Sequence, residues 1–241
     1  MKGPRQLFLD VKLDDSVSLD NFILCNSTEL AIKSLQNFLS EDSLINFLFL
    51  WGKKGTGKKY LLQAANKSCI DKEKKTGFLS LADIEQRRPE ILEGLEILDV
   101  VFIEDIHLIP NTDVWLQAFF HFINTCLLKG TKLFFSSDLV AKDIVINLAD
   151  LKSRLMLFTP VEIPEITEEE KRSALIQSAK RRGLTLEEKT ISYILTHTSR
   201  SLSDLLSLLA DLDNFSLEKQ RKLTIPLVKE LIANRSNSPY K

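Results

Sequence analysis

Residues 52–59 read Gly52-Lys53-Lys54-Gly55-Thr56-Gly57-Lys58-Lys59. This run matches the pattern G-x-x-x-x-G-K-[ST] at every defined position except the last, where Lys59 replaces the hydroxyl residue. In loops of this kind the backbone N–H groups and the lysine hold phosphates, and the hydroxyl holds Mg²⁺. The sequence therefore predicts a nucleotide site more firmly than it predicts hydrolysis.

A lysine-rich surface turn that happens to contain glycines is the alternative interpretation of this loop. The flanking sequence favours the phosphate site, because residues 45–51 form an apolar run typical of a doubly buried strand and residues 58–65 favour a helix. The glycines let the backbone approach an anion, and the helix offers free N–H groups. Four lysines at a helix N-terminus are unfavourable unless an anion binds there.

Apolar runs alternate with helical patterns over the first two thirds of the chain. The runs that predict strands lie at residues 45–51, 77–81, 100–103, 132–135 and 161–163. A capping box at Asn26 and Glu29 predicts a first helix that ends before Asp42. This alternation is typical of an α/β fold, a doubly wound parallel sheet of about five strands.

After Pro164 the pattern is helical only. Helix starts are predicted at Thr167, Thr185, Ser201 and near Thr224. The first residues carry scattered apolar side chains among acids and predict an arm without helical period. The sequence therefore predicts an N-terminal arm over residues 1–19, an α/β domain over 20–164 and a small all-helical domain over 165–241.

Polar residues end two of the predicted strands. Glu104 and Asp105 follow the run at 100–103, where one acid can hold a metal ion and another can position an attacking water. An ordinary acidic loop is the alternative. Glu104 stands where such strands usually carry aspartate, and its longer side chain can ligate Mg²⁺ through water. Ser137 ends another strand, at the sheet edge where ligands bind.

The charge balance argues against a protein held on nucleic acid or membranes by its overall field. The 241 residues include 32 Lys and Arg against 33 Asp and Glu, a net charge of −1. No segment approaches the roughly 18 apolar residues of a membrane span. Cys25, Cys69 and Cys126 lie far apart, which predicts thiols in a reducing cytoplasm. His107 shows no metal-ligand spacing and is expected to be structural.

Taken together, these segments resemble AAA+ ATPases of the bacterial replication-initiator DnaA type, and within that branch the shorter regulatory Hda group. The resemblance rests on residues 18–23, 52–59, 104–106, 136–138, 150–155 and 220–230. It implies an AAA+ P-loop domain followed by a helical lid, with ADP or ATP as the ligand and Mg²⁺ on Glu104 as an open question. The nucleotide-binding residues expected are Ile23, Leu24, Gly52, Gly55, Thr56, Gly57, Lys58, Lys59, Glu104, Asp105 and Ser137.

Two further roles come from the resemblance. Arg154 matches the family's arginine finger, which in the Hda group is implicated in stimulating hydrolysis of ATP bound to DnaA; by residue type alone it would be a solvated charge. Gln6, Leu7, Leu9 and Val11 resemble the motif with which Hda-type proteins dock on the β sliding clamp of DNA polymerase III. Without the resemblance, this arm would be a tail with incidental leucines.

Three positions depart from the DnaA pattern around the nucleotide. Ser203 stands where relatives carry a second-sensor arginine, Cys25 stands where many have glycine near the adenine, and Lys59 replaces the hydroxyl. An arginine contact to a phosphate contributes about 1.5–3 kcal/mol, which Arg200 is the candidate to replace. These departures favour retention of ADP or slow turnover over vigorous hydrolysis.

The favoured hypothesis is a regulator of replication initiation that binds the DNA-loaded clamp and ADP, and that presents Arg154 to ATP on DnaA to prevent re-initiation. DNA is then contacted mainly through the clamp, and a homo-oligomer stays open. The alternative is an autonomous DNA-dependent AAA+ ATPase of the initiator or helicase-loader type. That alternative usually brings a separate DNA-reading module, for which we expect no room after the lid. A third is a binding protein whose loop holds no nucleotide.

Overall fold

The computed structural model describes residues 17–19, 22, 25–82, 84, 88–198 and 201–236, without the side chains of Ser203, Arg235 and Ser236. The described residues form two compact units. Of the described residues, the first unit holds 17–19, 22, 28–54 and those from 58 to 164, and the second holds those from 165 to 236 with the short stretches 25–27 and 55–57. Several predictions fall outside the described residues: those at Gln6, Leu7, Leu9, Val11, Ile23, Leu24 and Arg200.

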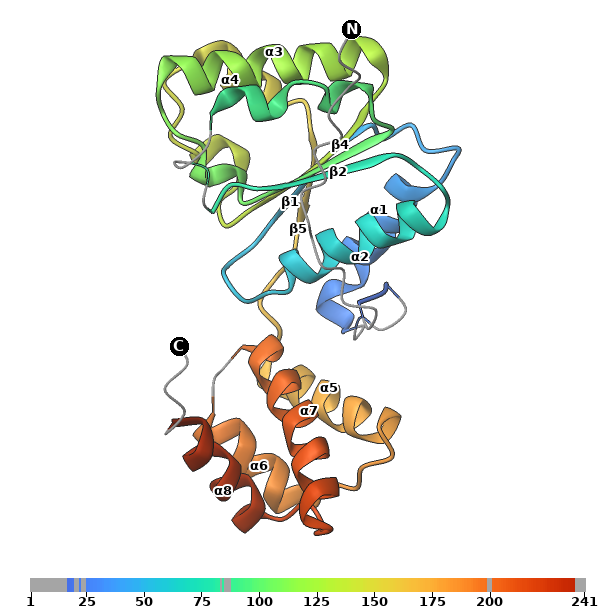
Figure 1. The fold of residues 1–241 in the computed structure, drawn as a ribbon, viewed down its shortest axis with the longest axis vertical. Helices are drawn as coiled ribbons and strands as arrows, with labels where there is room; N and C mark the ends of the chain where they lie inside the picture. Colours follow the sequence, from blue (N-terminus) through green and yellow to red (C-terminus); the bar gives the residue numbers. More distant parts are fainter. Residues whose placement is uncertain are drawn as a thin grey trace, which may run out of the picture. The chain divides into compact units, whose positions relative to one another are not determined.

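The first unit is built on a five-stranded sheet in the order β2-β3-β4-β1-β5, in which every neighbouring pair is parallel (Figure 1). The strands are β1 Phe47–Trp51, β2 Thr76–Ser80, β3 Val100–Glu104, β4 Lys132–Ser137 and β5 Thr159–Glu162. All five predicted strands form, with ends that differ by at most two residues from the predicted ranges. The predicted doubly wound α/β fold is confirmed.

Helices cover both faces of this sheet, α3 and α4 on one and α1 and α2 on the other (Figure 1). The helices are α1 Glu29–Leu39, α2 Lys58–Asp71, α3 Asp113–Lys129 and α4 Ala149–Leu155. The described residues before 165 also include short 3-10 turns: η1 Asn26–Thr28, η3 Pro89–Leu92, η4 Leu95–Ile97, η5 Ile106–Leu108 and η6 Ala141–Asp143.

Successive strand residues enter different cores. Phe49 and Phe135 join the cluster formed with α3 and α4, whereas Leu48 and Phe134 join the cluster formed with α1 and α2. Side chains alternate between the two faces of a strand, so a sheet covered on both sides needs apolar residues at nearly every strand position. This is the physical reason for the continuous apolar runs in the sequence.

The second unit consists of helices in its described residues: α5 Glu168–Arg181, α6 Glu188–His197, α7 Leu202–Lys219 and α8 Ile225–Ser236. Leucine and isoleucine side chains from all four helices form its core, among them Leu175, Ile191, Leu209 and Leu227. No helix in the described part of the chain is long and apolar enough to cross a membrane.

The predicted helix caps have mixed outcomes. Thr167 and Glu170 form a capping box at the start of α5, as predicted. The box predicted at Asn26 is wrong, because residues 26–28 form a 3-10 turn and the N-cap of α1, Thr28, makes no side-chain cap hydrogen bond. Thr185 does not cap α6, whose N-cap is Glu187. In both wrong cases the spacing was present but the helix began later than the candidate cap.

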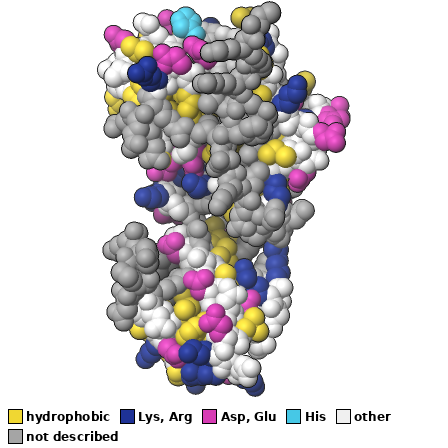
Figure 2. Space-filling view, viewed as in Figure 1, with side chains coloured by type: hydrophobic (Ala, Val, Ile, Leu, Met, Phe, Trp, Pro, Cys, Tyr) yellow, Lys and Arg dark blue, Asp and Glu magenta, His cyan; other side chains and the backbone are white. Residues whose placement is uncertain are grey.

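Acidic and basic side chains occur side by side on the face drawn in Figure 2. This mixing agrees with the net charge of −1 for the whole sequence. A single-sign field that would draw the protein to a polyanion is therefore not a feature of this face.

Replacing Phe134 with alanine should lower the free energy of unfolding of the first unit by about 3–5 kcal/mol. Its ring is fully buried on the central strand β4 and packs between Phe38 and Phe102, with centroid separations of 5.6 and 5.8 Å. Both tryptophans, Trp51 and Trp115, lie in the first unit, so urea unfolding followed by tryptophan fluorescence reports on it.

The matched control is Leu128→Ala on α3, because this leucine is 87% exposed. Its effect should stay within about 0.5 kcal/mol. Equal losses in the two variants would contradict the assignment of Phe134 to the core.

Candidate functional site

The strand order brings three sequence segments to one edge of the sheet. β4 lies between β1 and β3, and all three are parallel, so the segments that follow them emerge at the same edge. The backbone N–H of Gly52, after β1, donates to the carbonyl oxygen of Ser137, at the end of β4, over 3.2 Å. The predicted loop and the predicted strand-end residues are therefore neighbours.

The loop after β1 has a backbone that only glycine adopts without strain. Gly55 and Gly57 have φ of 85° and 96°, in the region that side chains with a Cβ rarely occupy. The helix α2 begins at Lys58, and its first turn contains no acid. Because the first N–H groups of a helix lack partners within the helix, this end of α2 suits an anion.

Lys58 is held by three acceptors. Its ammonium donates to the carbonyl oxygens of Gly52 at 2.6 Å and Lys53 at 2.8 Å, and it pairs with the Oδ1 of Asp138 at 2.8 Å. The side chain is only 6% exposed. An ammonium has three donors, so all of them are used, and the lysine is oriented by the loop and by β4 together.

Lys59 reaches the strand-end acid. Its ammonium lies 3.2 Å from Oε1 and 3.4 Å from Oε2 of Glu104. The glutamate side chain is 6% exposed and the lysine side chain is 67% exposed, so an accessible cation covers a buried carboxylate. The residue that breaks the loop pattern and the acid that begins the acidic segment are thus direct partners.

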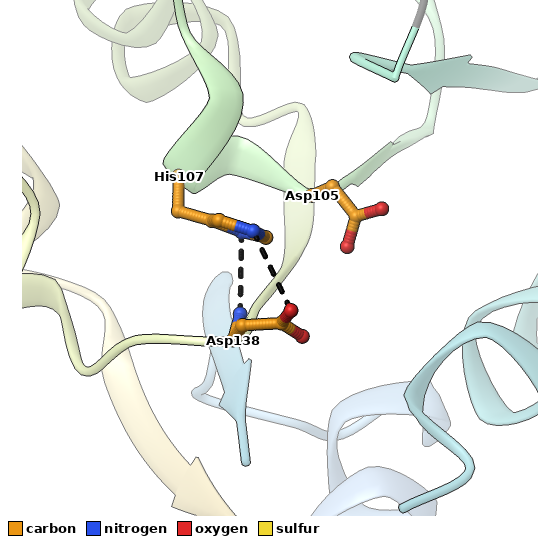
Figure 3. A group of neighbouring side chains, drawn as sticks. All are labelled: Asp105, His107 and Asp138. Carbon is orange, nitrogen blue, oxygen red and sulfur yellow. Dashed lines mark hydrogen bonds and ion pairs between the residues drawn. The ribbon is translucent and has the colours of Figure 1, made fainter. Parts of the chain in front are cut away.

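Asp105, His107 and Asp138 form a cluster (Figure 3). Asp138 links this cluster to Lys58 through their ion pair. The Nδ1 atom of His107 accepts a hydrogen bond from the backbone N–H of Asp138 at 3.2 Å, and its Nε2 lies 3.7 Å from Oδ2 of the same residue. One ligand atom from each of the three residues lies within 4.8 Å of the others.

Asp105 carries two unfavourable features. Its backbone is left-handed, with φ 60° and ψ 48°, and its N–H donates to the hydroxyl oxygen of Ser136 at 3.2 Å. Burial raises the pKa of the Asp105 carboxyl, and the neighbouring Glu104 and Asp138 carboxylates raise it further, while His107 and Lys58 act in the opposite direction. A non-glycine residue in this conformation is uncommon and often lies at a functional site.

Other predicted residues lie elsewhere or play a different part. Ser137 is fully buried; its hydroxyl accepts from the Leu139 N–H at 3.0 Å and its carbonyl accepts from Gly52. Arg154 is half-buried in the last turn of α4, and its guanidinium carbon lies 6.0 Å from the ring centroid of Phe120 on α3. Cys25 belongs to the second unit, where it packs with Ala174 on α5.

Two residues of the cluster were not predicted. Asp138 belongs to the polar strand end at residues 136–138 that the sequence singled out, but only Ser137 was named there as a site residue, and the pairing of Asp138 with Lys58 was not predicted. His107, expected to be structural, lies in the site and holds the backbone of Asp138. No spacing signal could identify His107, because its partner lies 31 residues further along the chain.

Asp105→Asn should raise the melting temperature at neutral pH. The raised pKa means that ionised Asp105 destabilises the folded chain above that pKa, whereas the amide carries no charge and tolerates left-handed backbone. Below the ordinary aspartate pKa of about 3.9, Asp105 is protonated both folded and unfolded, so the gain should disappear on acidification. Thermal unfolding at several pH values measures this.

Asp42→Asn is the control, because Asp42 is exposed in the turn after α1. It should leave the melting temperature nearly unchanged throughout. A lower melting temperature for Asp105→Asn at neutral pH, or a gain that grows on acidification, would contradict the argument.

Comparisons with family models and with solved structures both relate this chain to DnaA. Residues 13–159 match the bacterial DnaA ATPase domain, and residues 168–232 match the lid domain of Hda. The AMPPCP-bound structure of DnaA from Aquifex aeolicus superposes with a TM-score of 0.72 at 24% identity, over 83% of this chain and 66% of that one. This chain thus spans about two thirds of the Aquifex DnaA chain.

Two structures from Thermotoga maritima share the fold. Domain III of the replication initiation protein DnaA has a TM-score of 0.75 at 17% identity, over 92% of this chain and 98% of that one. The RuvB Holliday junction branch migration motor has a TM-score of 0.64 at 15% identity, over 89% and 70%. Identities this low show the fold alone. The match to the DnaA ATPase domain covers more than half of the sequence. The chain therefore belongs to the DnaA branch of AAA+ proteins and carries a lid of the Hda type.

Proposed function

We propose that this protein is an Hda-type regulator of replication initiation, which binds adenine nucleotide in its own loop and stimulates hydrolysis of ATP on DnaA. The observation that carries the proposal is the succession, in one chain, of a DnaA-type ATPase domain and an Hda-type lid. We assign residues 1–19 to a clamp-binding arm, 20–164 to the nucleotide-binding domain and 165–241 to the lid. Such a protein supplies a catalytic group to its partner.

The proposed ligand of the loop is ADP. The DnaA structure from Aquifex aeolicus carries AMPPCP, which supports an adenine nucleotide in a chain of the same branch. Lys58 and the N-terminus of α2 supply the positive charge that a polyphosphate needs. Lys59 replaces the loop hydroxyl and pairs with Glu104, and Ser203 replaces the second-sensor arginine. The chain therefore lacks groups that select and hydrolyse ATP, which favours the diphosphate.

Arg154 is the proposed arginine finger. Its guanidinium packs over Phe120, which orients the side chain while leaving part of it accessible. Such an arginine accelerates phosphoryl transfer by about 10³–10⁵ because it stabilises charge that develops in the transition state. The hydrolysis that Arg154 serves is therefore that of ATP on DnaA.

The arm is proposed to recruit the protein to DNA indirectly. A short extended peptide can insert Leu7 and Leu9 into an apolar groove of the β sliding clamp, while Gln6 makes polar contacts. The balanced charge of the chain supports contact with DNA through the clamp rather than through a basic face.

Nucleotide released from the purified, denatured protein should be ADP, and Lys58→Ala should weaken ADP binding by roughly 10- to 100-fold. The proposal requires a phosphate oxygen to replace one of the three protein acceptors of Lys58. Such a charge-assisted contact contributes about 1.5–3 kcal/mol, and each 1.4 kcal/mol corresponds to a factor of ten. Chromatography identifies the nucleotide and isothermal titration calorimetry measures its affinity.

Lys72→Ala, just beyond the far end of α2, is the matched control and should bind ADP normally. Tryptophan fluorescence during thermal unfolding checks that both variants fold. No released nucleotide, with no stabilisation by added ADP or ATP, would support instead a protein whose loop binds no nucleotide.

Arg154→Ala should reduce stimulated hydrolysis of DnaA-bound ATP by roughly 10³-fold or more, with clamp binding retained. Arg154→Lys should remain defective, because lysine keeps the charge but loses the planar fork of donors. Single-turnover hydrolysis of radiolabelled ATP on DnaA, in the presence of clamp loaded on DNA, measures the effect.

Arg182→Ala is the control, since Arg182 makes a partly exposed ion pair with Asp213 in the second unit. Unchanged stimulation by Arg154→Ala would reject the arginine-finger role. Intrinsic ATP hydrolysis by the chain alone that is lost in Lys58→Ala would favour the autonomous ATPase instead.

A further inference from the structure

The ion pair of Lys59 with Glu104 lies where the loop pattern predicts a metal ligand. A P-loop of this kind holds Mg²⁺ with the hydroxyl that follows the conserved lysine and with an acid at a strand end. Here the first position is Lys59 and the strand-end acid is Glu104, and the two side chains contact each other through both carboxylate oxygens. The two expected protein ligands are therefore bound to one another.

These residues do not fit Mg²⁺. The ion requires oxygen ligands in near-ideal octahedral geometry, and an ammonium has donors but no acceptor. Lys59 therefore cannot ligate Mg²⁺, and its positive charge repels the ion. Lys59 also pairs with the Glu104 carboxylate, which would be the remaining protein ligand. The Glu104 side chain is nearly inaccessible, and the Lys59 ammonium contacts both of its carboxylate oxygens from the exposed side.

The neighbouring cluster does not restore the missing ligands. Among the described residues, Asp105, His107 and Asp138 form the group whose ligand atoms come close enough to hold a metal ion. Asp138 is already paired with Lys58 at 2.8 Å, and His107 contributes a nitrogen ligand, which Mg²⁺ does not favour. Glu104, the acid beside the loop, is not part of this group.

The charge of Lys59 also favours binding of a polyphosphate at the loop. An unpaired Glu104 carboxylate next to the loop would repel a polyphosphate, and Mg²⁺ normally offsets such repulsion. Lys59 neutralises this carboxylate, and two thirds of its side chain stays exposed to a ligand arriving at the loop. A fixed ammonium therefore supplies positive charge at the position from which a divalent cation is excluded.

We propose that this chain binds adenine nucleotide without Mg²⁺, and that the ammonium of Lys59 takes over the charge-neutralising part of the metal. The inference rests on the proposed nucleotide binding and deepens it. It also accounts for the separation of roles in the proposed function, since the chain keeps a nucleotide without assembling a metal-dependent hydrolytic site. The determinant of this behaviour is one residue, the last position of the loop pattern.

The test uses the full chain and ADP, titrated by calorimetry once with excess MgCl₂ and once with EDTA. The two dissociation constants should agree within about threefold, below the factor of ten that corresponds to about 1.4 kcal/mol. Lys59→Thr restores the hydroxyl of the pattern and frees Glu104, so its affinity should become at least about tenfold higher with MgCl₂ than with EDTA.

Lys72→Thr is the matched control, because it makes the same substitution beyond the other end of α2 and should behave as the unaltered chain does. Thermal unfolding with tryptophan fluorescence confirms that each variant is folded. Magnesium dependence of about tenfold in the unaltered chain would overturn the inference while leaving nucleotide binding intact. Magnesium independence that persists in Lys59→Thr would overturn the role of Lys59. An absence of ADP binding under both conditions would instead reject the proposed nucleotide binding.

Discussion

The parallel pairing of β4 with both β1 and β3 determines where every charged residue of the site lies. Because the three strands run in the same direction, the segments that follow them emerge at one edge. This adjacency brings Lys58 from after β1 to Asp138 from after β4, and Lys59 to Glu104 at the end of β3. It depends in turn on a sheet buried on both faces, whose strands have apolar side chains at nearly every position.

At this edge of the sheet some charged side chains are favourably paired and one, Asp105, is not. Lys58 is saturated by two carbonyl oxygens and Asp138, and Lys59 covers Glu104. Asp105 is the acid whose pKa is raised by burial and by the neighbouring carboxylates, and its backbone is in a conformation that few residues other than glycine adopt. Unfavourable features of this kind persist where the surrounding structure holds them, which is common at binding and catalytic sites.

The proposed division of labour follows from this arrangement. A loop whose last position is lysine can hold phosphates while lacking the ligands of a hydrolytic metal. Arg154 is separate from that chemistry, since it is oriented by packing over Phe120 on the neighbouring helix. In the function that we propose, the chain keeps its own nucleotide and supplies one positive group to the nucleotide of a partner.

The sequence by itself determined the class of fold and the positions of its loops, because hydrophobic periodicity and glycine spacing are local properties that depend only on the order of residues. It predicted all five strands and the strand, loop and helix order around residues 52–58, whereas phosphate binding by that loop stays a prediction. It placed two helix caps wrongly, because the spacing of a capping box recurs where no helix begins. Only the tertiary structure decided the pairings of Lys58 with Asp138, Lys59 with Glu104 and His107 with Asp138, since residues 31 to 80 positions apart meet through the strand order.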